Sequence, residues 1–192
     1  MKQNFFLTCL LLFSSLFVCS QKKEYEMVVP GLVNPWGFTF LPDNTMLITE
    51  KEGKLIHFKN GTKTEIENLP KIYVRGQGGF LDIALHPNYK KNGWIYFTYA
   101  SEAGEGSGGN TTLMRAQLKN NSLTNIEILY KASPNSRKGQ HFGSRIVFDK
   151  ENHVYFSVGD RGNRDLNPQD ITRDCGKIHR LNDDGSIPKD NP

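Results

Sequence analysis

Three polar side chains of the 192-residue chain could do chemistry together. His141 stands before the strand-like run "SRIVFD", Asp160 follows the run "HVYFSVG", and Gln77 precedes an earlier run, "FLDIAL". An imidazole can take up a proton near neutral pH, and a carboxylate can bind a hydroxyl or stabilise an imidazolium. An amide both donates and accepts hydrogen bonds. If the fold brings these residues together, they could take a proton from a bound hydroxyl group.

The segments that must position these side chains have an all-β texture. Short runs rich in Val, Ile, Phe, Tyr and Thr alternate with clusters of Gly, Asn, Asp and Pro, and no helical periodicity lasts beyond two turns. We therefore expect strands at 36–40, 45–50, 54–59, 80–85, 94–100, 112–118, 126–132, 144–149, 153–159 and 176–181.

These strands recur as a repeated unit. An alternating strand, a polar turn and a second alternating strand start at Phe38, Ile83 and Ile146, at intervals of 45 and 63 residues. The first interval fits a four-stranded propeller blade of roughly 40 to 50 residues. The longer interval contains two insertions, at 101–110 and 133–141. The repeat therefore favours a β-propeller over a β-sandwich.

Blade geometry predicts that the three polar residues meet. The first two strands of a blade form a hairpin, so the start of the first and the end of the second lie at the same end of the sheet. We expect Gln77, His141 and Asp160 to converge on one face near the propeller axis, where propellers commonly hold ligands. Simpler interpretations stay open: His141 as a loop residue, Gln77 as part of a glycine turn, and "GDRG" as a β-turn in which Asp160 binds its own backbone.

The N-terminal segment 1–20 has the pattern of a signal peptide. Lys2 precedes the apolar run "FFLTCLLLFSSLFV", and "VCS" offers a cleavage point before Gln21. The run is short for a membrane span, so we expect an exported protein, periplasmic or secreted, with no span after cleavage. Lipoprotein anchoring through Cys19 is disfavoured because Val18 is bulkier than the small residue usually found there.

The mature part, 21–192, has the length of one domain. Its single remaining cysteine, Cys175, cannot form an intrachain disulfide. The formal net charge of +4 is small and dispersed, so the sequence predicts no nucleic-acid partner.

Four motifs in consistent order resemble the glucose/sorbosone dehydrogenase family: "GQGGFLDIALHPNY", "HFGSRIVFD", "SVGDRGNR" and "GKIHRLNDDGSIPKDNP". The match runs from about Trp36 to the last residue. The resemblance implies a six-bladed β-propeller, of which this chain holds roughly the first half. It also implies the chemistry of soluble aldose dehydrogenases, which use pyrroloquinoline quinone and Ca²⁺. On this resemblance we expect the isolated 192 residues to be inactive and the whole protein to be an enzyme.

The resemblance also implies roles for particular residues. His141 matches the general base, and Gln77 matches a residue beside both quinone and sugar. The residues that correspond to the substrate pocket are Gln77, Gln140, Asp160, Asp165 and Leu166. Gln140 replaces an acid of the glucose enzymes, and Asp165 replaces their usual amide, so the broader aldose branch fits better than glucose specificity.

The implied reaction oxidises the anomeric hydroxyl of an aldose to a lactone and passes electrons to an external acceptor. The arginines that hold the cofactor and the calcium ligands are expected mostly beyond residue 192. Two alternatives remain. A calcium-dependent sugar-lactone hydrolase would need converging carboxylates, and only Glu50 and Asp160 are suitably placed in the sequence. A non-catalytic propeller that binds carbohydrate or protein is disfavoured by the joint presence of His141 and Gln77.

Overall fold

The computed structural model describes residues 25–191, and residues 31–191 belong to one compact unit, to which the following description applies. The expected signal peptide and Cys19 lie outside the described residues. Among those described, no helix is both long and apolar enough to cross a membrane.

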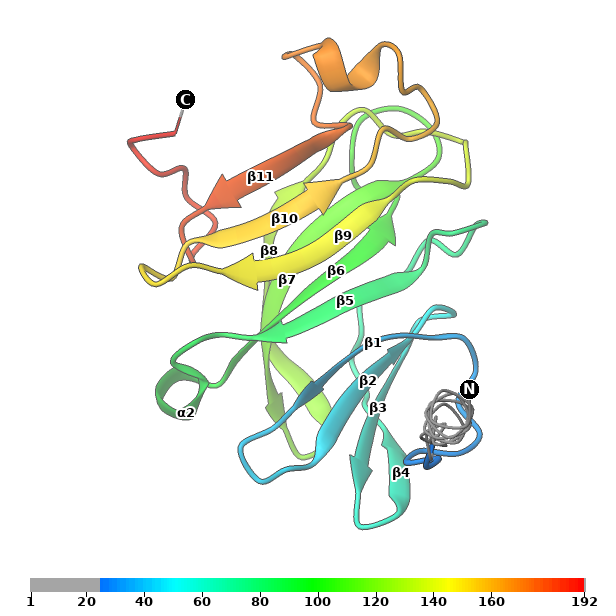
Figure 1. The fold of residues 1–192 in the computed structure, drawn as a ribbon, viewed down its shortest axis with the longest axis vertical. Helices are drawn as coiled ribbons and strands as arrows, with labels where there is room; N and C mark the ends of the chain where they lie inside the picture. Colours follow the sequence, from blue (N-terminus) through cyan, green and yellow to red (C-terminus); the bar gives the residue numbers. More distant parts are fainter. Residues whose placement is uncertain (1–24, 192) are drawn as a thin grey trace, which may run out of the picture. The chain divides into compact units, whose positions relative to one another are not determined.

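Eleven strands of the described part form three antiparallel sheets (Figure 1). The first sheet contains β1 (Pro35–Phe40), β2 (Met46–Glu50), β3 (Lys54–Lys59) and β4 (Thr62–Glu65). The second contains β5 (Phe80–Leu85), β6 (Trp94–Ser101), β7 (Asn110–Lys119) and β8 (Ser122–Lys131). The third contains β9 (Gly143–Phe148), β10 (Val154–Val158) and β11 (Lys177–Leu181).

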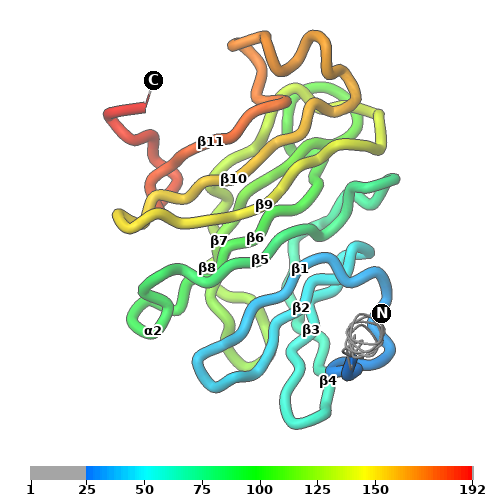
Figure 2. Tube along the Cα trace, in the orientation of Figure 1, coloured from blue at the N-terminus to red at the C-terminus, as the bar shows by residue number. Residues whose placement is uncertain are grey.

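Each sheet is a meander in which consecutive strands are neighbours, and the chain then passes to the next sheet. β5 packs against β1 and β2, and β9 packs against β5 and β6, so successive sheets lie face to face (Figure 2). This arrangement is that of consecutive β-propeller blades. The repeat is confirmed by the register, because Phe38, Ile83 and Ile146 pair with equivalent residues of the second strand in their sheets.

The strands β6 and β7 of the second sheet are mostly buried, because this sheet lies between the other two, whereas the outer strand β8 is largely exposed. Side chains of a strand alternate between faces, and neighbouring residues of β6 accordingly enter different cores. Phe97 packs with Leu47 in the core between the first and second sheets. Tyr96 packs with Phe156 in the core between the second and third sheets. The strand β6 is therefore apolar along most of its length rather than alternating in polarity.

A buried hydroxyl group joins the first sheet to the second. Thr49 Oγ1 accepts a hydrogen bond from Gly37 N within its own sheet at 3.0 Å. The same hydroxyl donates to the carbonyl of Leu81 in β5 at 2.6 Å. One side chain thus fixes the first strand of its own blade and the first strand of the next.

The same device joins the second sheet to the third. Thr98 Oγ1 accepts from Asp82 N at 3.1 Å and donates to the carbonyl of Ser144 in β9 at 2.9 Å. Ser157 occupies the corresponding place in β10, and its Oγ accepts from Ser144 N at 3.0 Å. We call Thr49, Thr98 and Ser157 the hydroxyl links.

All ten predicted strands are present, but the sequence did not indicate three other elements. β4 reads "TKTE", and as a short, mostly exposed outer strand it lacks the apolar alternation that identifies strands. The helix α2 (Tyr89–Asn92) is a single turn within the predicted polar turn and ends at left-handed Gly93. The 3₁₀ turn η1 (Asn167–Gln169) follows Leu166.

Candidate functional site

The predicted convergence of Gln77, His141 and Asp160 is confirmed by the geometry. Gln77 lies in the loop before β5, His141 lies in the loop before β9, and Asp160 follows β10. The backbone N–H of His141 donates to Gln77 Oε1 at 2.7 Å. The imidazole Nδ1 of His141 lies 2.8 Å from Asp160 Oδ1. Three segments far apart in the chain therefore meet at one end of the sheets.

The partner of Nδ1 determines the tautomer of the neutral His141 ring. An ionised carboxylate only accepts hydrogen bonds, so Nδ1 carries the hydrogen and Nε2 keeps its lone pair. No residue in the range 25–191 makes a hydrogen bond to Nε2, and the side chain is 48% exposed. The ring is thus held at one nitrogen and open at the other, which is the arrangement that a general base requires.

Asp160 is held in its ionised form. Its Oδ1 accepts from His141 Nδ1 and from the backbone N–H of Gly162 at 2.7 Å. The hydrogen bond from His141 is the main cause that lowers the pKa of Asp160, and the Gly162 N–H adds to it. Asp160 therefore binds the backbone of its own turn, as the β-turn interpretation predicts, and it also binds the imidazole of His141. The two interpretations are compatible.

The orientation of the Gln77 amide follows from its partner. A backbone N–H must find an acceptor, so the oxygen of the amide faces His141 N and the NH₂ group faces away. The backbone of Gln77 is also fixed, since its N–H donates to the Gly139 carbonyl at 2.6 Å. Within the described chain, Gln77 Nε2 has no acceptor and remains available to a ligand.

A cavity of about 240 Å³ opens beside His141 and Asp160. The remaining residues that line it are Gln140, Gly162, Asn163, Arg164 and Asp165. The carboxylate of Asp165 is exposed and lies 3.8 Å from Arg164 Nε. Leu166 is 51% exposed and is absent from the lining of this cavity. Three of the five residues expected to bind substrate, Gln140, Asp160 and Asp165, therefore line this cavity, and Gln77 and Leu166 do not.

The backbone of His141 is strained. Its φ of 54° lies in the left-handed region, which is uncommon for residues other than glycine, although histidine, asparagine and aspartate adopt it more often than the rest. Such conformations cost about 1–3 kcal/mol and persist where the surroundings enforce them, often at functional sites. Here the hydrogen bonds to Gln77 and Asp160 enforce it.

Sequence reasoning missed Arg161, which is only 1% exposed. Its guanidinium donates to the carbonyls of Gln140, Lys138 (2.8 Å) and Gly109 (3.2 Å) and lies 3.4 Å from the centroid of the Phe142 ring. Burial lowers its pKa to about 10, so it stays charged at neutral pH. An arginine inside a "GDRG" turn is ordinarily exposed, and nothing in the sequence marks this one as buried.

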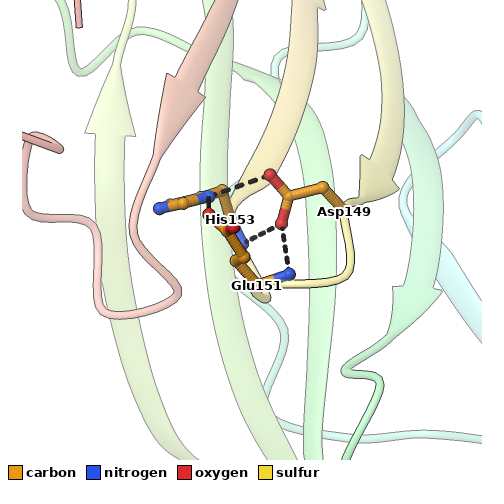
Figure 3. A group of neighbouring side chains, drawn as sticks. All are labelled: Asp149, Glu151 and His153. Carbon is orange, nitrogen blue, oxygen red and sulfur yellow. Dashed lines mark hydrogen bonds and ion pairs between the residues drawn. The ribbon is translucent and has the colours of Figure 1, made fainter. Parts of the chain in front are cut away.

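A second polar cluster lies at the turn between β9 and β10 (Figure 3). Asp149 Oδ1 accepts from the backbone N–H groups of Glu151 and His153, both at 2.9 Å, and Oδ2 lies 2.8 Å from His153 Nδ1. The guanidinium of Arg180 lies 3.3 Å from the same ring nitrogen. The carboxylate of Asp149 thus serves its own turn, and a cation already lies beside the cluster.

The two carboxylates considered for a lactonase do not share a site. Glu50 Oε1 accepts from Val33 N at 2.6 Å and lines a separate cavity of about 500 Å³. Asp160 lines the cavity beside His141. Within residues 25–191 these two residues therefore do not form one cation site.

The fold and the site define a class: a β-propeller whose loops present a carboxylate-bound histidine and an amide at one end of adjacent blades. The family model described as "Glucose / Sorbosone dehydrogenase" matches residues 32–192. The chain belongs to this family.

Relatives of known description agree with that assignment. The chain is 34% identical to aldose sugar dehydrogenase YliI of Escherichia coli (strain K12), covering 100% of this chain and 53% of that protein. It is 28% identical to quinoprotein glucose dehydrogenase B of Acinetobacter calcoaceticus, covering 90% and 42%. The PQQ-bound aldose sugar dehydrogenase of Streptomyces coelicolor matches with a TM-score of 0.76 and 29% identity, covering 88% and 51%. The chain spans about half the length of the curated relatives it matches.

Proposed function

We propose that the whole protein is a quinone-dependent aldose dehydrogenase in which His141 is the general base. The observation that carries this proposal is the ring of His141, bound at Nδ1 by Asp160 and open at Nε2 beside the cavity. Support also comes from the relatives, of which one is called an aldose sugar dehydrogenase and another is a PQQ-bound enzyme of that name.

The residues present fit pyrroloquinoline quinone, an anionic planar quinone. Gln77 offers a free amide N–H₂, and Arg164 brings a cation to the cavity beside His141. When bound, this cofactor supplies the sink for the hydride from the anomeric carbon and passes the electrons to an external acceptor. We expect further cofactor-binding arginines and the calcium ligands mostly beyond residue 192.

The residues of this chain would handle the proton. Nε2 of His141 takes the hydrogen of the anomeric hydroxyl, whose oxygen forms the lactone carbonyl as the C–H bond breaks. The ring becomes an imidazolium, and the Asp160 carboxylate at 2.8 Å compensates its charge. Gln77 fixes the backbone of His141 through its amide oxygen, and its NH₂ group, which has no partner among the described residues, would bind the quinone or the sugar.

Substrate contacts would come from the edge of the same cavity. Gln140 and Asp165 line it and carry groups that can bind sugar hydroxyls. The second oxygen of Asp160 could accept another such bond. We place Leu166 further out, as an apolar contact for part of the sugar. We also propose export through segment 1–20, so that the reaction takes place in the periplasm or outside the cell.

The test is His141→Ala in the full-length protein, assayed by dye reduction with aldoses in the presence of quinone and Ca²⁺. We expect kcat to fall by roughly 10² to 10⁴, the usual effect of a positioned general base, with quinone affinity largely retained. His153→Ala is the matched control, because His153 also pairs with an aspartate at 2.8 Å but lies at the β9–β10 turn. Retention of most of the kcat in His141→Ala would refute the assignment.

The same assay separates the alternatives. A lactone hydrolase would release acid from a lactone without any electron acceptor, and a binding propeller would do neither. The separate cavities of Glu50 and Asp160 give no support to the hydrolase within the described part of the chain.

A further inference from the structure

We infer that Arg161 is a positioning residue of this site, which acts through His141 by holding the loop 138–142 that presents the imidazole to the cavity. The effect of Arg161 on the reaction rate depends on the proposed function. The effect of Arg161 on the orientation of the His141 ring is independent of that function.

The contacts of Arg161 are concentrated on this loop. The guanidinium donates to the carbonyls of Lys138 and Gln140, and it stacks on the ring of Phe142. Gln140 and Phe142 are the residues on either side of His141 in the chain. The buried side chain of Arg161 therefore binds the backbone just before His141 and packs against the side chain just after it.

The burial of Arg161 is costly and needs compensation. The side chain is 1% exposed and makes no ion pair with a carboxylate of residues 25–191. Its Nε has no partner among them. A buried cation is tolerated only where hydrogen bonds and ring contacts replace water. The loop carbonyls supply those bonds, and they in turn would be left without donors if an apolar side chain replaced Arg161.

Other groups bind further carbonyls of the 138–142 loop, so Arg161 is one of several residues that fix this loop. The Gly139 carbonyl accepts from Gln77 N at 2.6 Å, and the Phe142 carbonyl accepts from Thr111 Oγ1 at 2.5 Å. With Arg161 on the carbonyls of Lys138 and Gln140, every residue that flanks His141 in the loop has a bound carbonyl. This explains how a residue with φ of 54° can be kept in one conformation.

Arg161 also connects the two partners of the His141–Asp160 hydrogen bond. It directly follows Asp160, whose carboxylate binds the Nδ1 of His141. The hydrogen bonds of Arg161 thus fix the position of the loop relative to the carboxylate that orients its ring. Loss of Arg161 should therefore loosen the His141–Asp160 contact, which a residue that merely fills space would leave unchanged.

The test compares Arg161→Gln with Arg115→Gln in the full-length protein. Arg115 is a suitable control because its guanidinium also stacks on a ring, that of Trp94 at 4.3 Å, and binds Glu127 at 2.8 Å, away from the loop. The first readout is the ¹⁵N NMR spectrum of the histidine side chains without sugar or quinone. We expect the Nδ1–H tautomer of His141 to give way to an averaged signal in Arg161→Gln and to persist in Arg115→Gln.

The second readout is kinetic. We expect kcat to fall about 10- to 100-fold in Arg161→Gln, as displacement of a reactive group can cause. In a His141→Ala background the same substitution should lower kcat little further, because it acts through the ring. Arg161→Lys should lie between the wild type and Arg161→Gln, and it decides the question by the same spectrum if the glutamine variant does not fold.

An unchanged His141 tautomer in a folded Arg161 variant would overturn the inference, even if thermal stability falls. Failure of the base assignment gives a different pattern: His141→Ala would then keep its kcat, while the loss of the tautomer in Arg161→Gln would still be seen.

Discussion

The backbone of Gly159 lies directly against the carbonyl of His141, so close that a methyl group at position 159 would overlap the carbonyl oxygen. In the same place Gly159 N donates to the Phe142 carbonyl at 3.1 Å. The end of β10 and the loop before β9 are therefore in contact along their backbones, and the distance between Asp160 and His141 depends on it.

Gly159→Ala should therefore push the His141 loop away from Asp160. We expect a loss of about 1–3 kcal/mol in the free energy of unfolding, as in other overpacked sites, together with a lower kcat. Chemical denaturation and dye reduction measure the two effects. Gly61→Ala is the control, because no atom lies within 4 Å of the added methyl group. The only unfavourable feature is the φ of 78°, which alanine adopts less readily than glycine. Equal kcat losses in both variants would contradict the prediction.

Asp160→Asn tests whether this carboxylate orients the base or only binds sugar. Its contact with His141 Nδ1 at 2.8 Å leads us to expect mainly a fall in kcat, because a neutral amide compensates the imidazolium poorly. Steady-state kinetics with several aldoses provide the measurement. If KM rises while kcat stays unchanged, the role of Asp160 is sugar binding alone.

The hydroxyl links predict unequal losses of stability. Thr98→Val removes the acceptor of Asp82 N and the donor to the Ser144 carbonyl, both buried between blades. We expect a loss of roughly 1–3 kcal/mol in unfolding free energy. Ser157→Ala removes the one described bond, from Ser144 N, and should cost less. Urea denaturation of both variants checks the order, and a larger loss in Ser157→Ala would show that the inter-blade bond is unimportant.

His86 should make the stability depend on pH. It is 3% exposed, and its Nδ1 accepts from Asn88 N at 3.0 Å and from Asn92 Nδ2 at 2.9 Å. Its Nε2 lies 3.2 Å from Asp183 Oδ2. Burial is the main cause that lowers the pKa of His86 from its ordinary value of 6.5; nearby Arg115 adds to this, and Asp183 opposes it.

The sign of the effect follows from this lowered pKa. Between pH 6.5 and the lowered pKa of folded His86, this histidine is protonated in the unfolded chain but not in the folded one. The free energy of unfolding should therefore decrease as the pH is lowered through this range. One such group contributes at most about 1.4 kcal/mol per pH unit. Denaturation of wild type and His86→Gln across this range isolates the contribution. If the unfolding free energy of the wild type depends on pH no more steeply than that of His86→Gln, His86 makes no such contribution.

Much of the fold could be predicted from the sequence because a strand, a polar turn and a second strand recur along the chain, although β6 is apolar along most of its length instead of alternating as the repeat predicts. Phe38, Ile83 and Ile146 identify the blade repeat, and hairpin geometry alone then brings Gln77, His141 and Asp160 to one end. The strand β4 was missed because an exposed outer strand needs no apolar residues.

The sequence could not reveal the groups that hold the site together. Arg161 is buried where its guanidinium binds carbonyls of the 138–142 loop and the carbonyl of Gly109, which lies 52 residues before Arg161 in the chain. The role of Thr98 likewise depends on a carbonyl of the next blade, 46 residues further on. A threonine within a strand already has a sufficient explanation in its β propensity, so these contacts become visible only in three dimensions.

The hydroxyl links have a direction. At both described junctions the donor belongs to the earlier sheet and the acceptor to the later one, as with Thr49 and Leu81. During synthesis, each new first strand would therefore meet a sheet that is already made and already carries the group to bind it. The blades can then fold in the order of translation, and each folded sheet offers the hydroxyl group that binds the first strand of the next sheet.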